Sequence, residues 1–299
     1  MEQQQEYRRI GGVETSLWDS APPSGGSSTI IIMVHGGDPR SLSNALDWSS
    51  IWDPSALDAR LIAYDKPGQG MSYSGSMADS SMGADAIGSH LEALAESVGR
   101  PVVLMGHSRG ALPAADVALR RPDLVQGLVL VASNTLAPES ESTPGDFYPR
   151  AYSDPPEVLD TRYLRREPEM NSYSDRHIDA RFIEGRRRAA LQNGWWADRD
   201  RRFRVYQDVT LPTLRAMRSR VLEAINAVGF GMPVLQIWGQ DDKSAPVGLG
   251  HSLFARLAER TDAAASVVFN RSGHYVYREH PERFSSTVRA FLSARSGDR

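Results

Sequence analysis

The sequence predicts an α/β protein in which a mostly parallel sheet is covered by helices on both faces and a helical cap is inserted into it. Short apolar runs typical of buried strands alternate with helical patterns up to residue 135 and again after residue 231. Residues 136–230, between them, contain no comparable strand pattern. We therefore expect a first core segment at 1–135, a cap at 136–230 and a second core segment at 231–299.

The first core segment begins with a predicted β-hairpin. Tyr7 to Ile10 and Val13 to Trp18 flank Gly11-Gly12, a two-residue turn that suits antiparallel strands. The buried strands expected after it are Ile30 to Val34, Leu61 to Tyr64, Val102 to Met105 and Gly127 to Val131. One helix is predicted by apolar residues at i, i+4, i+7 and i+11, namely Ile87, Leu91, Leu94 and Val98. A second helix is predicted over the Ala/Leu-rich stretch Ala111 to Arg120.

The predicted cap is a Pro/Ser-rich coil followed by Arg-rich amphipathic helix patterns. Trp195 and Trp196 lie between these patterns, and three interpretations are open: they line a pocket, pack the cap or make a subunit contact. The strand and helix alternation then resumes with strands at Val234 to Trp238 and Ser266 to Phe269. The helices of this second segment are predicted by two apolar sets: Leu249, Leu253 and Leu257, then Phe284, Val288, Phe291 and Leu292.

Composition excludes several classes of protein. Lys plus Arg number 34 and Asp plus Glu number 37, giving a net charge of -3, so nothing favours nucleic acid or an anionic membrane as partner. The longest apolar runs, such as Ile30 to Val34, are far shorter than the ~20 residues of a membrane span. The polar, acidic start lacks the pattern of a signal peptide, so we expect a cytoplasmic protein that acts on a small molecule, as a monomer or a homo-oligomer. The absence of cysteine excludes disulfides, thiolate metal sites and a cysteine nucleophile.

A candidate nucleophile stands between a predicted strand and a predicted helix. Gly106-His107-Ser108-Arg109-Gly110 follows Val102 to Met105 and precedes Ala111 to Arg120. In this context G-x-S-x-G predicts a tight turn that exposes a serine, because larger residues at the two glycine positions would collide with the backbone. A serine hydroxyl is a weak nucleophile on its own, so a histidine base and an orienting carboxylate should follow.

His274 is the candidate base among the seven histidines. It lies in a loop directly after the strand ending at Phe269, at the carboxyl edge of the sheet, where open α/β sheets bind ligands. The other histidines considered are expected to be structural, because they lie on or beside predicted helices: His90, His177, His251 and His280.

Two aspartates compete for the orienting role in the loop after Val234 to Trp238. The spacing from Gly239 to Pro246 selects Asp242 over Asp241. The resulting chain order, Ser108, Asp242, His274, is the order expected when nucleophile, acid and base follow successive strands of one sheet.

An oxyanion formed during acyl transfer needs backbone donors. The N–H of Arg109, just after the nucleophile, is one candidate. His35-Gly36-Gly37 follows the strand Ile30 to Val34 and is placed to supply another, from Gly37 or Gly36. No cofactor or metal is needed for this chemistry, and none is expected.

Taken together, these motifs resemble the α/β-hydrolase fold over essentially the whole chain. The motifs that carry the resemblance are, in family order, His35-Gly36-Gly37, Asp65-Lys66-Pro67-Gly68-Gln69-Gly70-Met71-Ser72, Gly106 to Gly110, Gly239 to Asp242 and Gly273-His274. At a finer level, Gly273-His274-Tyr275 with the following Glu279 to Phe284, and the cap segment Ile178 to Ala190, are similar to meta-cleavage product hydrolases. Those enzymes hydrolyse a carbon–carbon bond in 2-hydroxy-6-oxo-dienoates.

The resemblance implies substrate contacts by Arg186, His107 and Tyr275. On a helical wheel, Arg186 borders the apolar face whereas Arg187 and Arg188 point away, and a cation beside an apolar pocket suits a substrate that carries a carboxylate or enolate. On geometry alone, a solvated face for all three arginines is an equal alternative.

The chain also departs from these enzymes. Asp38-Pro39-Arg40 replaces their glycine-rich continuation, His107 stands where asparagine is usual, and Tyr275 stands where tryptophan is common. The leading hypothesis is therefore carbon–carbon bond hydrolysis of such a dienoate, with a carboxylesterase or lactonase as the alternative. A binding protein or receptor that keeps the pocket without turnover is the hypothesis from another class.

Overall fold

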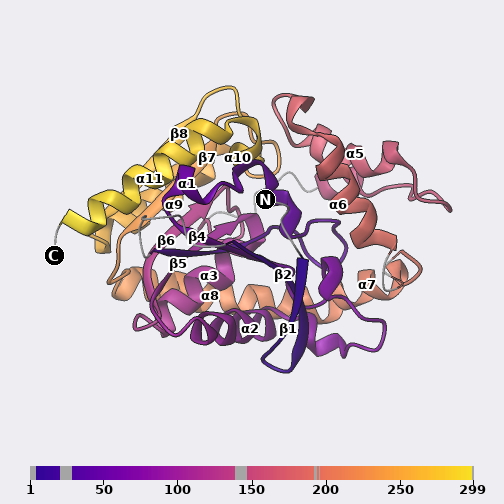
Figure 1. The fold of residues 1–299 in the computed structure, drawn as a ribbon, viewed down its shortest axis with the longest axis horizontal. Helices are drawn as coiled ribbons and strands as arrows, with labels where there is room; N and C mark the ends of the chain where they lie inside the picture. The colour runs from indigo at the N-terminus through magenta and orange to yellow at the C-terminus, as the bar shows by residue number, and fades with distance from the viewer. Residues whose placement is uncertain (1–4, 21–28, 139–146, 192–193, 195, 298–299) are drawn as a thin grey trace.

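The structure is a computed structural model and describes residues 5–20, 29–138, 147–191, 194 and 196–297. Its centre is an eight-stranded sheet in the order β1-β2-β4-β3-β5-β6-β7-β8 (Figure 1). The strands are β1 (Gln5–Ile10), β2 (Val13–Asp19), β3 (Ile30–Val34), β4 (Arg60–Tyr64), β5 (Val102–His107), β6 (Val125–Val131), β7 (Val234–Gly239) and β8 (Ala264–Phe269). β2 runs antiparallel to β1 and β4, and β3 to β8 run parallel to one another.

Helices cover both faces of the sheet because the parallel strands are apolar on both faces. Alternate residues of β3 divide between two cores: Ile30, Ile32 and Val34 face one, and Ile31 and Met33 face the other. The helices that pack on the first core are α2 (Ala84–Ser97), α3 (Ala111–Arg120), α8 (Leu211–Ala227) and α9 (Val247–Arg260). Those on the second are α1 (Pro54–Leu57), α10 (Val276–Glu279) and α11 (Pro281–Gly297), and α5 (Thr161–Met170) and α6 (Ala180–Leu191) also contribute residues to it.

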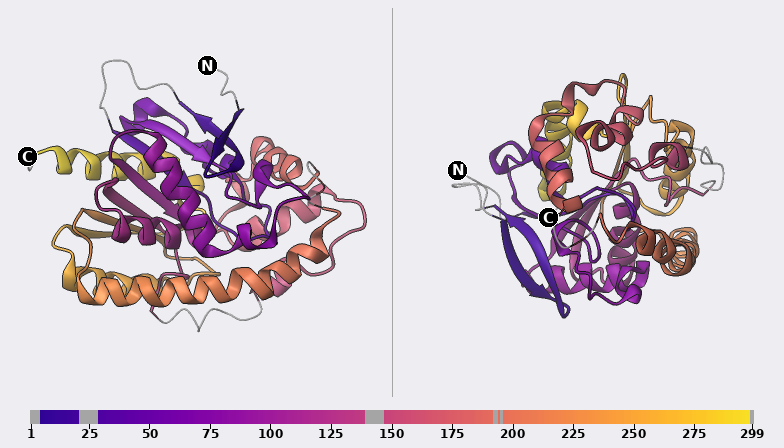
Figure 2. Two further views of the ribbon diagram at one scale, coloured as in Figure 1. Left: turned by 90° about the horizontal axis from the view of Figure 1, so that it is seen from below. Right: turned by 90° about the vertical axis from the view of Figure 1, so that its right-hand side faces the viewer.

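The segment between β6 and β7 consists, in its described residues, of helices joined by turns and coil, with no strand. It contains α4 (Phe147–Ala151), α5 (Thr161–Met170), α6 (Ala180–Leu191), α7 (Arg199–Val205), a π-helical turn at Tyr206–Thr210 and α8. Helices α5 and α6 stand apart from the sheet at one end of the molecule (Figure 1). By contrast, α8 lies along the body of the molecule and buries Met217, Val221 and Ile225 in the same core as α2 and α3 (Figure 2).

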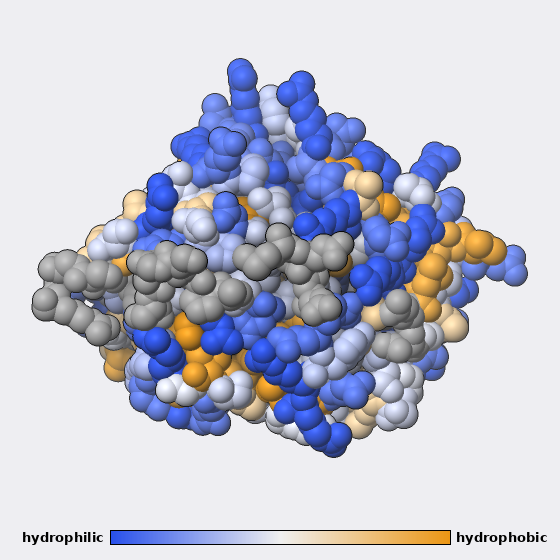
Figure 3. Space-filling model, in the orientation of Figure 1, coloured by the Kyte–Doolittle hydropathy of each residue, from blue (hydrophilic) through white to orange (hydrophobic). Residues whose placement is uncertain are grey.

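The α/β fold class predicted from the sequence is confirmed by this architecture. Where the cap ends stays a prediction, since α8, inside the expected 136–230, packs on core helices. In the described ranges, no helix is both long and apolar enough to cross a membrane. The face in Figure 3 is mainly hydrophilic, with only scattered apolar areas.

Candidate active site

The carboxyl ends of β3 and β5 mark the point where the strand order reverses. β3 pairs with β4 on one side and with β5 on the other, so the loops leaving β3 and β5 diverge. A crevice between such loops is where open α/β sheets bind ligands. The loop after β3 carries residues 35–37 and the turn after β5 carries Ser108.

Ser108 occupies the apex of a strained strand-to-helix turn. Its φ is +51°, a left-handed conformation that costs a residue with a side chain on the order of 1–3 kcal/mol. A Cβ on Gly106 would lie 2.5 Å from Cα of Ala111, and one on Gly110 would lie 2.4 Å from the carbonyl oxygen of Val34. Only glycine fits at these two positions, and the turn can therefore hold Ser108 at the carboxyl end of β5.

His274 and Asp242 form a buried pair at the same edge of the sheet. Nδ1 of His274 lies 2.7 Å from Oδ2 of Asp242. The other carboxylate oxygen, Oδ1, accepts hydrogen bonds from the backbone N–H groups of Ser244 at 3.0 Å and Ala245 at 2.7 Å. The carboxylate is therefore held on both sides, and the proton of the neutral imidazole is assigned to Nδ1, which leaves Nε2 as the basic atom.

The pKa of His274 reflects this pairing. Burial alone would lower it, but the charge of Asp242 and the hydrogen bond to it outweigh burial and raise the pKa of His274 above its usual value. Asp241 has another partner, because its Oδ2 lies 3.3 Å from the backbone nitrogen of Ser272 and accepts its hydrogen bond. Of the two aspartates, the structure places Asp242 against His274.

The loop after β3 passes directly against the turn that carries Ser108. A Cβ on Gly36 would lie 3.0 Å from Cβ of Ser108, so the backbone here is as close to Ser108 as it can be. Gly37 has a φ of +73°, and a Cβ there would lie 1.9 Å from Oγ of Ser41. The structure thus brings the two predicted donor segments, Gly36-Gly37 and the backbone after Ser108, to one place.

Three side chains hold three consecutive carbonyls of this loop. Nζ of the buried Lys66 donates to the carbonyl oxygen of Gly37 at 2.9 Å. Gln69 donates to the carbonyl of Asp38, and Nε of Arg202, from α7, donates to that of Pro39 at 2.6 Å. Burial lowers the pKa of Lys66 to about 7. The sequence did not indicate these hydrogen bonds. Lys66 and Gln69 belong to the motif Asp65 to Ser72, which gave no partner for either side chain, and Arg202 is one of several arginines in its stretch.

The departure at residues 38–40 builds an ion-pair cluster. The carboxylate of Asp38 lies 2.8 Å from Arg40 and 2.7 Å from Arg109. Burial would raise the pKa of Asp38, but the two guanidinium groups hold it well below its usual range. The guanidinium of Arg40 lies 3.3 Å from the ring centroid of Tyr206, in the π-helical turn. The side chain of Arg109 therefore pairs with Asp38, while its backbone N–H lies in the turn directly after Ser108.

His107, at the end of β5, packs against His274 with ring centroids 4.6 Å apart. Its Nε2 donates to the carbonyl oxygen of His274 at 3.0 Å, and the hydroxyl of Tyr277 lies 3.3 Å from its Nδ1. Burial, with the neighbouring charge of His274, lowers the pKa of His107 well below its usual value. Both ring nitrogens of His107 therefore contact groups of the protein, and these contacts hold the loop of His274 against the end of β5.

Arg186, on α6, is buried against Tyr275, the residue after His274. Its Nη2 donates to Oε2 of Glu167 at 3.0 Å and to the hydroxyl of Tyr275 at 2.7 Å, and that hydroxyl donates to the same Glu167 oxygen at 2.7 Å. Arg186 is 1% exposed, whereas Arg187 and Arg188 are partly exposed, as the wheel predicted. Glu167, which no sequence pattern singled out, makes Arg186 part of a neutralised cluster.

The remaining residues noted in the sequence have structural roles where they are described. Trp196 packs against Tyr163 with ring centroids 5.4 Å apart, and Trp195 lies outside the described residues. Three histidines hydrogen-bond to neighbouring protein groups, and His251 is exposed on α9; the three contacts are His90 with Thr15, His177 with Ser172 and His280 with the carbonyl of Arg271.

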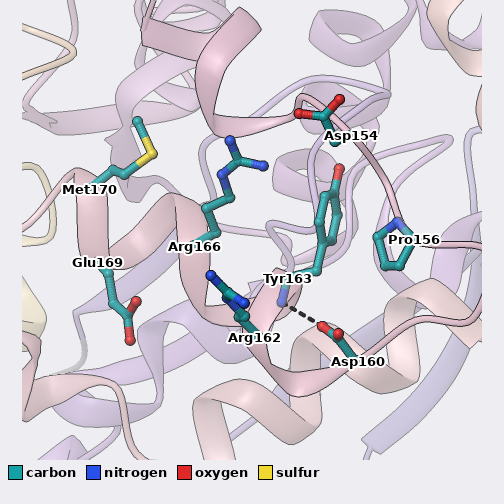
Figure 4. Close-up of a pocket in the computed structure, with 8 residues that line it drawn as sticks. All are labelled: Asp154, Pro156, Asp160, Arg162, Tyr163, Arg166, Glu169 and Met170. Atoms are coloured by element: carbon teal, nitrogen blue, oxygen red, sulfur yellow. Dashed lines mark hydrogen bonds between the residues drawn. The ribbon is translucent and has the colours of Figure 1, made fainter.

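One concavity on the surface does not belong to this centre. This concavity, of about 640 Å³, lies on α5 and the loop before it, and the side chains that line it, including Arg162, Arg166 and Tyr163, come from that segment alone (Figure 4). Ser108, Asp242 and His274 do not line it. In the described part of the chain, no cluster of three or more histidine or carboxylate side chains is arranged to hold a metal ion.

A strained serine turn, a histidine–aspartate pair and a glycine loop meeting at one sheet edge define the class of α/β hydrolases. Comparison with known proteins agrees: residues 31–287 match the model of the alpha/beta hydrolase family, and the chain belongs to that family.

Its relatives are hydrolases of more than one kind. A 2-hydroxy-6-oxononadienedioate/2-hydroxy-6-oxononatrienedioate hydrolase of Burkholderia vietnamiensis is 28% identical over 280 residues, covering 90% of this chain and 88% of that protein. A pimeloyl-[acyl-carrier protein] methyl ester esterase of Yersinia pestis is 25% identical over 273 residues, covering 87% and 92%. The structure of a meta-cleavage product hydrolase from Pseudomonas fluorescens has a TM-score of 0.73 at 21% identity and covers 97% of each chain. The predicted resemblance to meta-cleavage product hydrolases is thereby confirmed.

Proposed function

We propose that the protein is a serine hydrolase that cleaves a carbon–carbon bond of a 2-hydroxy-6-oxo-dienoate, with Ser108, His274 and Asp242 as its triad. The observation that carries the hydrolytic part is the 2.7 Å contact between His274 Nδ1 and Asp242 at the edge where Ser108 is held. Asp242 keeps the proton on Nδ1, so Nε2 is free to take the proton of Ser108.

The proposed steps use side chains and backbone groups of this chain together with water. After the dienol of the substrate becomes a ketone with help from His274 and Arg186, the oxygen of Ser108 attacks the distant carbonyl while His274 takes its proton. The negative oxygen is stabilised by the N–H groups of Gly37 and Arg109. The carbon–carbon bond then breaks, its electron pair moves through the conjugated fragment to the keto oxygen, and His274 returns the proton to that oxygen, which gives the hydroxydienoate. Water releases the acid from Ser108.

Arg186 supports the dienoate over other substrates. Its Nε is buried and has no hydrogen-bond partner among the described residues, so one donor remains for a carboxylate or enolate oxygen. This part also rests on similarity to the dienoate hydrolases at 24–28% identity.

The second candidate is a carboxylesterase or lactonase, and one contact favours it. Glu167 already pairs with Arg186, which reduces the attraction of this site for an anion and suits a neutral ester. The similarity to methyl ester esterases points the same way. A pocket without turnover, the third hypothesis, would give no product burst with an activated ester.

Arg186→Lys separates the two chemistries. Lysine keeps a cation beside Glu167 but loses the Nε donor and the planar fork of arginine. For a dienoate, kcat/KM should fall about ten- to a hundredfold, the size of a lost hydrogen bond to a charged group. A neutral p-nitrophenyl ester should change by less than about threefold. Arg187→Lys, one residue along α6 and partly exposed, is the matched control. Equal rates of dienoate hydrolysis in both variants would favour the esterase.

A further inference from the structure

Asn171 ends the helix α5 and is inserted between the two loops that carry His274 and Asp242. It is fully buried, and its backbone N–H caps the helix by donating to the carbonyls of Glu167 and Pro168. A Cβ on Gly273 would lie 2.5 Å from the carbonyl oxygen of Asn171, so the histidine loop approaches this residue as closely as a glycine permits. The two segments are far apart in the chain, and this approach is a property of the tertiary structure.

Each polar group of Asn171 has a different partner. Its carbonyl oxygen accepts the backbone N–H of His274 at 2.8 Å. Its Oδ1 accepts the backbone N–H of Ser244 at 3.2 Å, the same N–H that donates to Asp242 at 3.0 Å. Its Nδ2 donates to Oε1 of Glu167 at 3.2 Å, and Oε2 of Glu167 contacts Arg186.

We propose that Asn171 is a positioning residue that fixes the His274–Asp242 pair from the cap side and links it to Glu167 and Arg186. The reason is geometric. One short side chain and its own carbonyl span the histidine loop, the aspartate loop and the buried ion pair, so a shift of any one of them changes the hydrogen bonds of the others. Asn171 contacts no reacting atom and acts only through His274 and Asp242. The proposal rests on the proposed function to the extent that these two residues are catalytic.

The effect should be visible in the titration of His274. The charged or titratable groups that face its imidazole are Asp242 in the β7 loop, His107 at the end of β5, Glu167 on α5, Glu279 on α10 and Tyr275, whose ring centroid lies 5.8 Å from that of His274. Asp242 contributes the largest favourable interaction with the protonated ring, and its distance from Nδ1 is what Asn171 helps to keep. Losing the Asn171 side chain should loosen the pair and move the pKa of His274 down, toward its usual value.

The test compares Asn171→Ala, Asn171→Asp and Asn134→Ala in the full chain. Asn134 is the matched control, because its Nδ2 donates to the carbonyl of Ser244 at 2.9 Å and thus contacts the aspartate loop from the loop after β6. The readouts are the His274 titration followed by NMR, with the signal assigned from a His274→Gln protein, and kcat and KM for a p-nitrophenyl ester. Thermal unfolding checks that each variant is folded.

We expect Asn171→Ala to lower the pKa of His274 and to reduce kcat about tenfold or more, with KM changed by less than about threefold. Asn171→Asp keeps an acceptor for the N–H of Ser244 and adds a negative charge, although it loses the donor to Glu167, so it should hold the pKa of His274 at or above the wild-type value. Asn134→Ala should leave the pKa unchanged. The proposal is overturned if Asn171→Ala leaves both the titration and kcat unchanged, or if all three variants act alike.

These results stay separate from those on the proposed function. The titration of His274 needs no turnover, so the link from Asn171 to the pair can be measured even in a Ser108→Ala protein. Full activity of Ser108→Ala would remove the serine mechanism, whereas an unchanged titration in Asn171→Ala would remove only the positioning role.

Discussion

Asp242→Asn should reduce kcat by about four orders of magnitude, the loss seen when the orienting carboxylate of a triad becomes an amide. The structure explains the size of this effect. Oδ1 of Asp242 accepts two backbone N–H groups, from Ser244 and Ala245, so the amide oxygen of asparagine must take that side. The amide nitrogen then faces Nδ1 of His274 across 2.7 Å. A donor in that place forces Nδ1 to be an acceptor and puts the imidazole proton on Nε2, which can no longer take a proton from Ser108.

The assay is the pH dependence of kcat/KM for a p-nitrophenyl ester. In the wild type, the raised pKa of His274 should place the acid limb above the usual imidazole value, with activity falling as pH drops because the protonated ring is no base. In Asp242→Asn, the limb should move to lower pH, since the carboxylate that stabilises the cation is gone. Asp241→Asn, one residue away, should stay within about threefold of wild type. A larger loss in Asp241→Asn than in Asp242→Asn would refute the assignment of the acid.

Two further predictions concern strain and burial. Ser108→Gly should abolish hydrolysis yet raise the free energy of unfolding by about 1 kcal/mol, measured in urea, because glycine adopts a φ of +51° without strain; an unchanged or lower stability would contradict this. Lys66→Met should remove a pH dependence of stability. The pKa of Lys66 is about 7 in the folded protein and near 10.5 in the unfolded chain, so between these values the unfolded chain binds more protons. The free energy of unfolding of the wild type should therefore rise from pH 7 to 9 relative to the variant, by up to about 1.4 kcal/mol per pH unit. An equal difference in the free energy of unfolding between wild type and Lys66→Met at pH 7 and pH 9 would refute the lowered pKa of Lys66.

The elements that could be predicted from the sequence are those with local signals. The strand Ile30–Val34 and the helix Ala111–Arg120 have the expected bounds, because an uninterrupted apolar run and a helical period need no knowledge of neighbours. The pairing of Asp242 with His274 was also predicted, since both follow strands that end at one edge. Several side chains around the site could not be predicted.

Those side chains act through contacts between distant segments. Glu167 and Asn171 lie near a proline in α5, in a stretch whose sequence is otherwise typical of a polar surface helix, and only the fold brings them to His274. The role of His107 as a substrate contact stays a prediction, and the contacts of its two nitrogens with Tyr277 and the carbonyl of His274 were not visible in the sequence. The sequence pattern of a strand shows which loop follows it and hence at which edge of the sheet a residue lies. The hydrogen-bond partner of a buried polar atom comes from another part of the chain, and only the tertiary structure shows which.

The site therefore depends on the inserted helices as much as on the sheet. The sheet determines where Ser108, Asp242 and His274 lie, because each follows the end of a parallel strand or the loop after it. The insertion determines how they are held: Arg202 donates to the carbonyl of Pro39 in the loop after β3, Asn171 accepts the backbone N–H of His274, and Arg186 donates to the hydroxyl of Tyr275, the residue after His274. A change of cap sequence would alter not only which substrate fits but also the alignment of donors and base. Variation in the cap should for that reason change kcat as well as KM, which distinguishes this arrangement from a lid that only encloses the substrate.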